Sequence, residues 1–202
     1  MLFRSAPDIR TRQGFRDHTL LLFLYNSGAR ASEAVGVTVG DLDLPHTHPA
    51  SVRLMGKGSK VRRCPLWPST AEALKVLIAD RPSTASVFVN RRGHPMTRYG
   101  VHDVVARQGP TVARRLPSVQ HKRLSPHTIR HTTATHLLRA GVDINTIRAW
   151  LGHVSVDTTN VYADIDLATK AKALATCAIV PDPGGAPVWK DNRDLLVFLR
   201  SL

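Results

Sequence analysis

The sequence predicts a mainly α-helical domain with a small antiparallel β-sheet, an α+β fold. Apolar residues recur at helical spacing in several segments, and residues that often cap helices stand at the ends of these segments. Two short runs of strand-forming residues flank Gly56-Lys57-Gly58-Ser59, a composition typical of a hairpin turn. With 202 residues, the chain is long enough for one domain with a buried core and a short appendage at each end.

The N-terminal half of the sequence is predicted to hold three helices and the hairpin. Helices are expected over residues 14–26, 31–37 and 69–80, and strands over residues 51–55 and 60–66. Ser69 and Glu72 have the spacing of a capping box at the start of the third helix, and Pro82 closes that helix. Lys57 is expected at the tip of the hairpin.

The rest of the chain is predicted to hold further helices joined by short connections. The expected elements are a strand over residues 87–89, an exposed basic loop over 109–122, a proline-glycine linker over 181–187, and helices over 98–108, 126–140, 144–150, 156–162, 166–178 and 192–202. Thr97, Ser125 and Asp143 are the expected N-caps of three of these helices. Gly141 and Gly152 are expected to end two of them.

The balance of charge favours nucleic acid as the partner. Lysine and arginine outnumber the acidic residues by 28 to 15, for a formal net charge of +13, and such a surface attracts a polyanion. Aromatic residues make up 5% of the chain, which argues against a stacking surface for single-stranded nucleic acid. We therefore expect double-stranded DNA, held through its phosphates.

The cysteine content and the apolar runs indicate the compartment. The two cysteines, Cys64 and Cys177, form no CxxC pair, so the sequence predicts neither a disulfide framework nor a thiolate zinc site. No apolar run has the length of a membrane-spanning helix, and the first residues lack the apolar stretch of a signal peptide. We expect a cytoplasmic, nucleoid-associated protein of a prokaryotic cell, with no membrane partner.

The most informative segment reads SPHTIRH and spans residues 125–131. A serine cap followed by proline places His127 and Arg130 near the start of a helix, where free backbone amides favour an anion. Leu-Gly-His follows at residues 151–153, and Tyr162 stands nine residues after His153. This arrangement gathers phosphate-binding groups just upstream of a candidate nucleophilic hydroxyl, and so indicates cutting and rejoining of DNA.

Two earlier segments supply the cations that such a site needs. They read SGARASE over residues 27–33 and MGKGSK over residues 55–60. Arg30 and Arg130 suit the non-bridging phosphate oxygens, because a guanidinium presents a planar fork of donors and stays charged. Glu33, one helical turn after Arg30, is placed to orient it.

The proton transfers can be assigned to the nucleophile and two further side chains, and a third side chain adds a hydrogen bond. Tyr162 has a phenol with an ordinary pKa of about 10, so a base must take its proton during attack on phosphorus. His127 is the first candidate for that base. Lys57, on a flexible hairpin, is the candidate acid that protonates the departing deoxyribose oxygen. His153 would donate a hydrogen bond to the same phosphate.

In their order along the chain, these segments resemble the tyrosine recombinase (phage integrase) family over about residues 14–177. The resemblance implies the catalytic-domain fold of that family, a covalent 3′-phosphotyrosyl intermediate with a free 5′-hydroxyl, and no need for a metal, ATP or another cofactor. It also implies a homotetramer on two DNA duplexes, formed by exchange of residues 163–178. The site residues that it implies are Arg30, Lys57, His127, Arg130, His153 and Tyr162.

The resemblance also sets expectations about domains. Residues 1–13 are expected to be an N-terminal extension, residues 14–178 the catalytic domain for DNA breakage and rejoining, and residues 179–202 a linker and a C-terminal helix. Family members usually carry a separate N-terminal core-binding domain, which is expected to be absent here. The chain would then be a truncated copy, a catalytic fragment, or a member that relies on a partner protein for the other half of the DNA clamp. Ala29 departs from the larger apolar residue usual before the first arginine.

We therefore expect a site-specific recombinase of a mobile element, an integrase or transposase. One alternative is a DNA-binding remnant without recombination activity, and another is DNA relaxation like that of a type IB topoisomerase. A zinc site of His127 and His131 with His136 or His153 is disfavoured, because the sequence has no HExxH and no carboxylate placed as a further ligand. His131 and His136 are instead expected to pack or bond within the helix layer.

Overall fold

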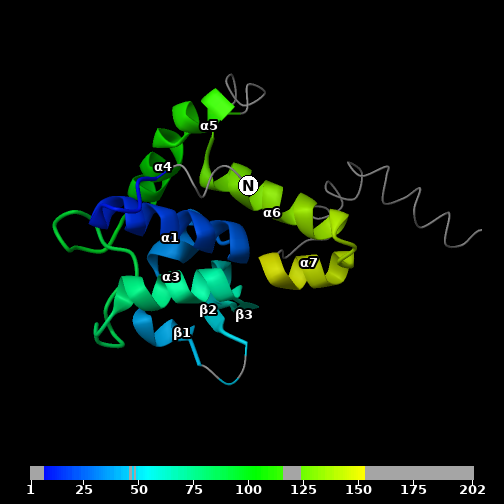
Figure 1. The fold of residues 1–202 in the computed structure, drawn as a ribbon. Coiled ribbons are helices and arrows are strands. Elements are labelled where there is room, and N and C mark those ends of the chain that lie inside the picture. Colours follow the sequence, from blue (N-terminus) through cyan, green and yellow to red (C-terminus); the bar gives the residue numbers. More distant parts are fainter. Residues whose placement is uncertain (1–6, 46, 48, 116–123, 153–202) are drawn as a thin grey trace, which may run out of the picture. The chain divides into compact units, whose positions relative to one another are not determined.

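Helix α1 (Arg12–Ser27) lies at the centre of the part of the chain that the structure describes (Figure 1). The structure is a computed structural model that describes residues 7–45, 47, 49–115 and 124–152. These residues belong to a unit that spans Met1–Asp166, and a second unit, Leu167–Leu202, lies outside the described residues. The helices predicted over residues 156–162, 166–178 and 192–202 and the linker over 181–187 lie outside them too.

The described elements are mostly short helices around one small sheet. The remaining α-helices are α2 (Ala31–Val35), α3 (Pro68–Ile78), α4 (Arg98–Arg107), α5 (Gly109–Arg115), α6 (Pro126–Arg139) and α7 (Ile144–Leu151). The strands are β1 (Leu42–Asp43), β2 (Ser51–Met55) and β3 (Val61–Pro65), and two 3-10 helices are η1 (Val39–Asp41) and η2 (Lys57–Ser59). The predicted fold class, mainly α with a small antiparallel sheet, is confirmed.

Local capping and burial explain why α1 forms and where it ends. The Thr11 hydroxyl accepts a hydrogen bond from the Gly14 amide at 3.0 Å, which satisfies one free donor of the first turn. Gly28 ends the helix in the left-handed conformation, at φ 59°, which glycine adopts without steric cost. The run Leu20–Leu24 is buried on all sides, because α3 contacts one side of α1 and α6 another.

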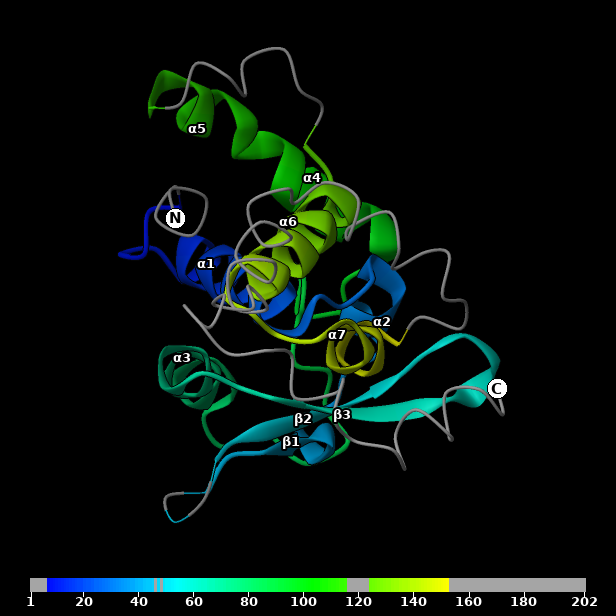
Figure 2. The same ribbon diagram turned by 90° about the vertical axis from the view of Figure 1, so that its right-hand side faces the viewer.

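The sheet confirms the predicted hairpin. Strands β1, β2 and β3 pair in sequence order and antiparallel, with Val52 opposite Cys64 and Leu54 opposite Arg62. Val52 and Leu54 are fully buried, whereas the alternate residues of β2 face outward, as the two-residue period of a strand requires. Figure 2 shows the sheet on the opposite side of α1 from α6.

The core joins α1, the sheet and α4. Phe23 packs against Phe88 with ring centroids 5.4 Å apart, and Leu54 and Val101 belong to the same buried cluster. A smaller cluster, around Ile147, holds α7 against α6. The end of α7 also contacts β3, where the Arg62 side chain donates a hydrogen bond to the Trp150 carbonyl. No helix in the described ranges is long and apolar enough to cross a membrane.

Three local predictions were wrong. Residues 109–115 form α5 instead of a loop, because Val112 is buried at 3% exposure and its amide bonds to Gln108 at 3.0 Å. Helix α3 begins at Pro68 with Trp67 as its N-cap, so Ser69 is not the cap. Residues 87–89 form no strand but one isolated bridge, between Val89 and Pro95.

Helix α3 begins before the predicted position because contacts with α1 fix the residue that precedes the helix. The Trp67 amide donates to the Asn26 side chain at 2.8 Å, and the rings of Trp67 and Tyr25 lie 5.3 Å apart. These contacts place Pro68 at the first helical position, where proline is well tolerated. Strand β1 was not predicted, because two residues are too short to show a periodic pattern. The N-caps Thr97, Ser125 and Asp143 are confirmed.

Candidate functional site

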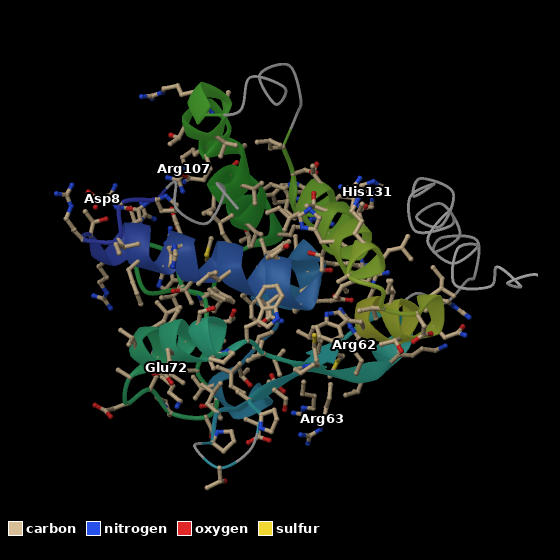
Figure 3. The ribbon with its side chains drawn as sticks, turned by 45° about the vertical axis from the view of Figure 1, so that its right-hand side comes forward. Asp8, Arg62, Arg63, Glu72, Arg107 and His131 are labelled. Atoms are coloured by element: carbon tan, nitrogen blue, oxygen red, sulfur yellow. The ribbon has the colours of Figure 1, made fainter. Side chains whose placement is uncertain are left out.

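A hollow of about 920 Å³ lies between α2, the β2–β3 hairpin and the end of α7. Arg30, Arg62 and Gly152 are among its lining residues, so segments far apart in the sequence meet here. Figure 3 shows Arg62 between the sheet and α7. We call this hollow the arginine–hairpin site.

Arg30 is held in this site by the first turn of α2. Its backbone amide donates to Glu33 Oε2 at 2.9 Å, and its guanidinium Nη1 donates to Glu33 Oε1 at 2.8 Å. The Arg30 side chain keeps 40% exposure, whereas the Glu33 side chain is only 2% exposed. The expected contact between Glu33 and Arg30 is thus present, and it leaves the arginine open to the hollow.

Arg62 also binds the Glu33 carboxylate. Arg62 was not identified from the sequence as a residue of the site. Its Nη2 lies 2.7 Å from Oε2 and its Nη1 lies 3.1 Å from Oε1, while its Nε donates to the Trp150 carbonyl at 2.9 Å. The available signal was strand alternation, because Arg62 stands two residues before the buried Cys64 and so faces inward with it.

Two arginines lower the pKa of the shared carboxylate. Burial acts to raise the pKa of Glu33, but the hydrogen bonds and charge of Arg62, together with the amide and side chain of Arg30, outweigh it. The net result is a pKa below the ordinary value, so Glu33 is ionised at neutral pH. An ionised Glu33 can hold both guanidinium groups in one geometry.

Arg130 points into the molecule from α6 and is 3% exposed. Its Nη1 donates to the Gly28 carbonyl at 2.5 Å, and its Nη2 donates to the Leu151 carbonyl at 2.6 Å. Arg130 therefore links the turn before Arg30 to the end of α7. This placement adds an anchoring contact that the sequence did not reveal.

The end of α7 is fixed by two guanidinium groups. Arg62 binds the Trp150 carbonyl and Arg130 binds the Leu151 carbonyl, at the helix end where the dipole favours cations. Gly152 then turns the chain at φ 65°, and a Cβ on it would lie 3.0 Å from Arg62 Nη1. The backbone that leads into His153 is thus held tightly beside the hollow.

The other predicted site residues are placed to different extents. His127, the second residue of α6, is exposed at the start of that helix. Lys57 begins η2 in the hairpin turn, directly after Gly56, which lines the hollow, and its side chain is outside the described part. His153 and Tyr162 lie outside the described residues. The structure thus joins Arg30 and Arg130 through the Gly28 turn, and the catalytic roles of all six residues stay predictions.

The other two histidines of α6, His131 and His136, were predicted to pack or bond within the helix layer. His136 Nδ1 lies 2.6 Å from the Tyr25 hydroxyl, which confirms the predicted bond for this residue. His131 is half-buried. Among the residues that the structure describes, no three His, Cys, Asp or Glu side chains come close enough to hold a metal ion.

Comparison with known proteins places this chain in a family. The model of the phage integrase family matches residues 4–168, most of the chain. The chain belongs to the phage integrase family. The putative integrase/recombinase y4rC of Sinorhizobium fredii is 36% identical to this integrase-family chain over 200 residues, covering 98% of this chain and 59% of the relative.

Other relatives of this integrase-family chain are named tyrosine recombinases. Tyrosine recombinase XerD of Bifidobacterium longum is 36% identical over 173 residues, covering 80% of this chain and 53% of XerD. Tyrosine recombinase XerD of Corynebacterium glutamicum is 38% identical over 173 residues, covering 82% and 54%. The chain thus spans between half and three fifths of the length of these curated relatives.

Solved structures share the integrase-family fold. The XerH site-specific recombinase bound to its difH substrate matches with a TM-score of 0.70 and 22% identity, over 86% of this chain and 51% of XerH. The XerA recombinase matches with a TM-score of 0.68 and 22% identity, over 87% of this chain and 62% of XerA. These matches agree with the predicted catalytic-domain architecture.

Proposed function

We propose that this chain carries the catalytic domain of a site-specific DNA recombinase, which cuts and rejoins duplex DNA through a covalent bond between Tyr162 and a 3′-phosphate. The observation that carries the proposal is the arginine–hairpin site. There Arg30 stays open to the hollow while Glu33, Arg62 and Arg130 hold it beside the segment that leads into His153. Such a rigid set of cations suits the charge that grows on a phosphate during attack.

The reaction exchanges one phosphodiester for another. The Tyr162 oxygen attacks phosphorus and its proton passes to His127, while the bond from phosphorus to the 5′-oxygen breaks. Lys57 gives its proton to that oxygen, which leaves as a 5′-hydroxyl. Attack by the 5′-hydroxyl of a second DNA end reverses each transfer and releases Tyr162. The bond energy is conserved, so ATP is not consumed.

The cations act on the same phosphate throughout. Arg30 donates to the non-bridging oxygens from its exposed side, and His153 adds a hydrogen bond. Arg130 is assigned to the same phosphate, with the carbonyls of Gly28 and Leu151 as its anchors. Loss of one such donor is expected to slow cleavage by roughly 100- to 1000-fold.

The test is covalent capture of DNA. Wild type, Tyr162→Phe and Tyr99→Phe are incubated with nicked duplexes from the flanks of the element, in chelator, and run on a denaturing gel. Tyr99 is 64% exposed on α4 and serves as the matched control. An adduct with wild type and Tyr99→Phe, and none with Tyr162→Phe, is the expected result. Retardation on a native gel without any adduct would instead favour a DNA-binding remnant.

The biological setting is proposed on the same basis. We expect the protein to act on double-stranded DNA as the integrase or transposase of a mobile element, in the prokaryotic cytoplasm. The fold is shared with the Tn1549 transposon integrase, solved in complex with a circular intermediate DNA, at a TM-score of 0.67 and 21% identity. Assembly on DNA is expected to be a homotetramer through exchange of residues 163–178. Sedimentation of the protein–DNA complex tests this stoichiometry.

A further inference from the structure

A second hollow, of about 480 Å³, lies at the N-terminal end of α1, at the other end of that helix from Arg30. Figure 1 shows this end of α1 beside the green segment that connects α3 to α4. We call the hollow the arginine basin, because five arginines line it. They are Arg12, Arg16, Arg81, Arg91 and Arg92.

Two of the five arginines build the wall of the basin. Arg16 is 7% exposed, pairs with Asp17 at 2.5 Å and donates to the Val89 carbonyl at 3.0 Å. Arg81 donates to the Leu77 carbonyl at 2.5 Å and to the Ser86 carbonyl at 3.0 Å. These contacts tie α1, α3 and the connection after α3 together, so the basin is a preformed feature.

The other three arginines are exposed at its mouth. Arg12, Arg91 and Arg92 have no carboxylate within 4.0 Å among the residues that the structure describes. Arg91 and Arg92 stand on a tight turn, in which Asn90 Oδ1 accepts the Arg92 amide at 2.9 Å. The turn closes through the Asn90 amide and the His94 carbonyl at 2.7 Å. The arginines are thus presented on an ordered backbone, which lowers the entropic cost of binding.

The positive charges of Arg12 and Arg81 lie close enough in the basin to repel each other. Burial lowers the pKa of Arg81, and the nearby charge of Arg12 lowers it further. Asp17, a buried carboxylate beside the basin, is shared by Arg16 and by Arg107, whose Nη2 lies 3.4 Å from Oδ2. An anion in the hollow would relieve this repulsion and accept hydrogen bonds from several guanidinium groups.

We infer that the arginine basin binds the phosphate backbone of the DNA that flanks the cleavage position. This inference rests on the proposed function, which puts the cleaved phosphate at Arg30. Helix α1 has 16 residues, or about 24 Å at 1.5 Å per residue, and it separates the two sites. At 3.4 Å per base pair, that length corresponds to about seven base pairs of duplex. Contacts to phosphate carry no base readout, so the basin fixes the register of the duplex and adds affinity for any flanking sequence.

The experiment compares two variants on two duplexes. Arg91→Ala/Arg92→Ala removes two exposed guanidinium groups without touching the core. Arg63→Ala/Lys75→Ala removes the same charge from positions that line neither hollow, Arg63 with a side chain 72% exposed and Lys75 with one 25% exposed, and is the matched control. One duplex extends 12 base pairs beyond the nick on both sides, and the other only four. The dissociation constant is measured for wild type and for both variants on each duplex, over a series of salt concentrations.

If the basin binds flanking phosphates, the loss of DNA affinity in the Arg91/Arg92 variant should depend on the length of the duplex. On the long duplex, the Arg91/Arg92 variant should bind roughly 10- to 100-fold more weakly than wild type, and its log–log salt slope should be smaller by about 2, one for each lost phosphate contact. On the short duplex, the variant should match wild type. The control variant should match wild type on both duplexes within about 3-fold.

Other outcomes would overturn the inference. An equal loss on both duplexes, or a loss no larger than that of the control, would show that the basin does not contact flanking phosphates. Unchanged DNA binding with altered self-association would assign the basin to a protein partner. The proposed function is judged separately, by adduct formation with the short nicked duplex. Affinity on the long duplex requires no cleavage, so the two proposals can fail independently.

Discussion

Arg62 and Glu33 form a two-point ion pair, with Nη2 2.7 Å from Oε2 and Nη1 3.1 Å from Oε1. The side chains are 11% and 2% exposed, so solvent screens the pair weakly. Through Arg62 Nε the same group reaches the Trp150 carbonyl, so one guanidinium joins the hairpin, α2 and the end of α7. This single residue links the segment of Lys57 to the segment of His153.

Replacing Arg62 by methionine should destabilise the domain strongly. The substitution keeps an apolar side chain of similar length but leaves Glu33 buried without one of its two partners, which typically costs about 3–5 kcal/mol. The free energy of unfolding is measured with urea. Arg63→Met is the control, because that arginine is 72% exposed and lies 3.8 Å from Asp43; it should change stability by less than about 1 kcal/mol. Equal effects of the two substitutions would contradict a buried role for the Arg62–Glu33 pair.

Glu33 should make stability depend on acid pH. Its folded-state pKa lies below the ordinary value of 4.5, so its contribution is present above pH 4.5 and is lost as the pH falls through the folded-state pKa. Wild type should therefore lose stability below about pH 5 more steeply than Glu33→Gln does. Urea titrations between about pH 3 and pH 7 measure the two slopes. Glu72→Gln removes an exposed carboxylate and controls for the change in net charge.

Gly28→Ala should be more damaging than Gly141→Ala. Both glycines have positive φ, 59° and 83°, so both substitutions strain the backbone by about 1 kcal/mol or more. Only at Gly28 would the new Cβ meet a neighbour, Leu151 Cδ2 at 2.3 Å, whereas nothing lies within 4 Å at Gly141. We expect the difference in unfolding free energy to exceed about 1 kcal/mol, together with slower adduct formation for Gly28→Ala. Indistinguishable melting temperatures would argue against the close approach of α7 to this turn.

Arg130→Lys should loosen the turn before Arg30 and the end of α7 together. A lysine ammonium lacks the planar fork that spans the Gly28 and Leu151 carbonyls. We expect a loss of roughly 2–4 kcal/mol in stability. Hydrogen exchange should become faster at the amides of both segments, and the control segment around α3 should not change. Faster exchange at only one of the two segments would mean that Arg130 does not bridge them.

Cys64 should resist alkylation in the folded protein. Burial raises the pKa of its thiol to about 12, against an ordinary value of 9.0, so very little thiolate forms at pH 8. Peptide-resolved mass spectrometry after brief treatment with iodoacetamide should show Cys64 unmodified in buffer and modified in urea. Rapid modification in buffer would contradict the burial of this strand.

Much of the fold could be predicted because its signals are local. The caps Thr97, Ser125 and Asp143 each act on amides two or three residues away, so their sequence context is enough to place three helices. The hairpin was predicted for the same reason, since glycines and strand-forming residues stand next to each other. Helix α5 was missed because the burial of Val112 depends on packing, which spacing does not show.

The candidate site was predicted only in part. The pair Arg30–Glu33 spans one helical turn and was predictable, whereas Arg62 reaches Glu33 across 29 positions and Arg130 reaches Gly28 across 102. The sequence by itself determined the helical fold class, the family and the short-range pairs, because each rests on residues close together or in a fixed order. Only the tertiary structure decided that buried arginines anchor the end of α7 and that others gather at the far end of α1, because chain folding sets the distances between remote side chains.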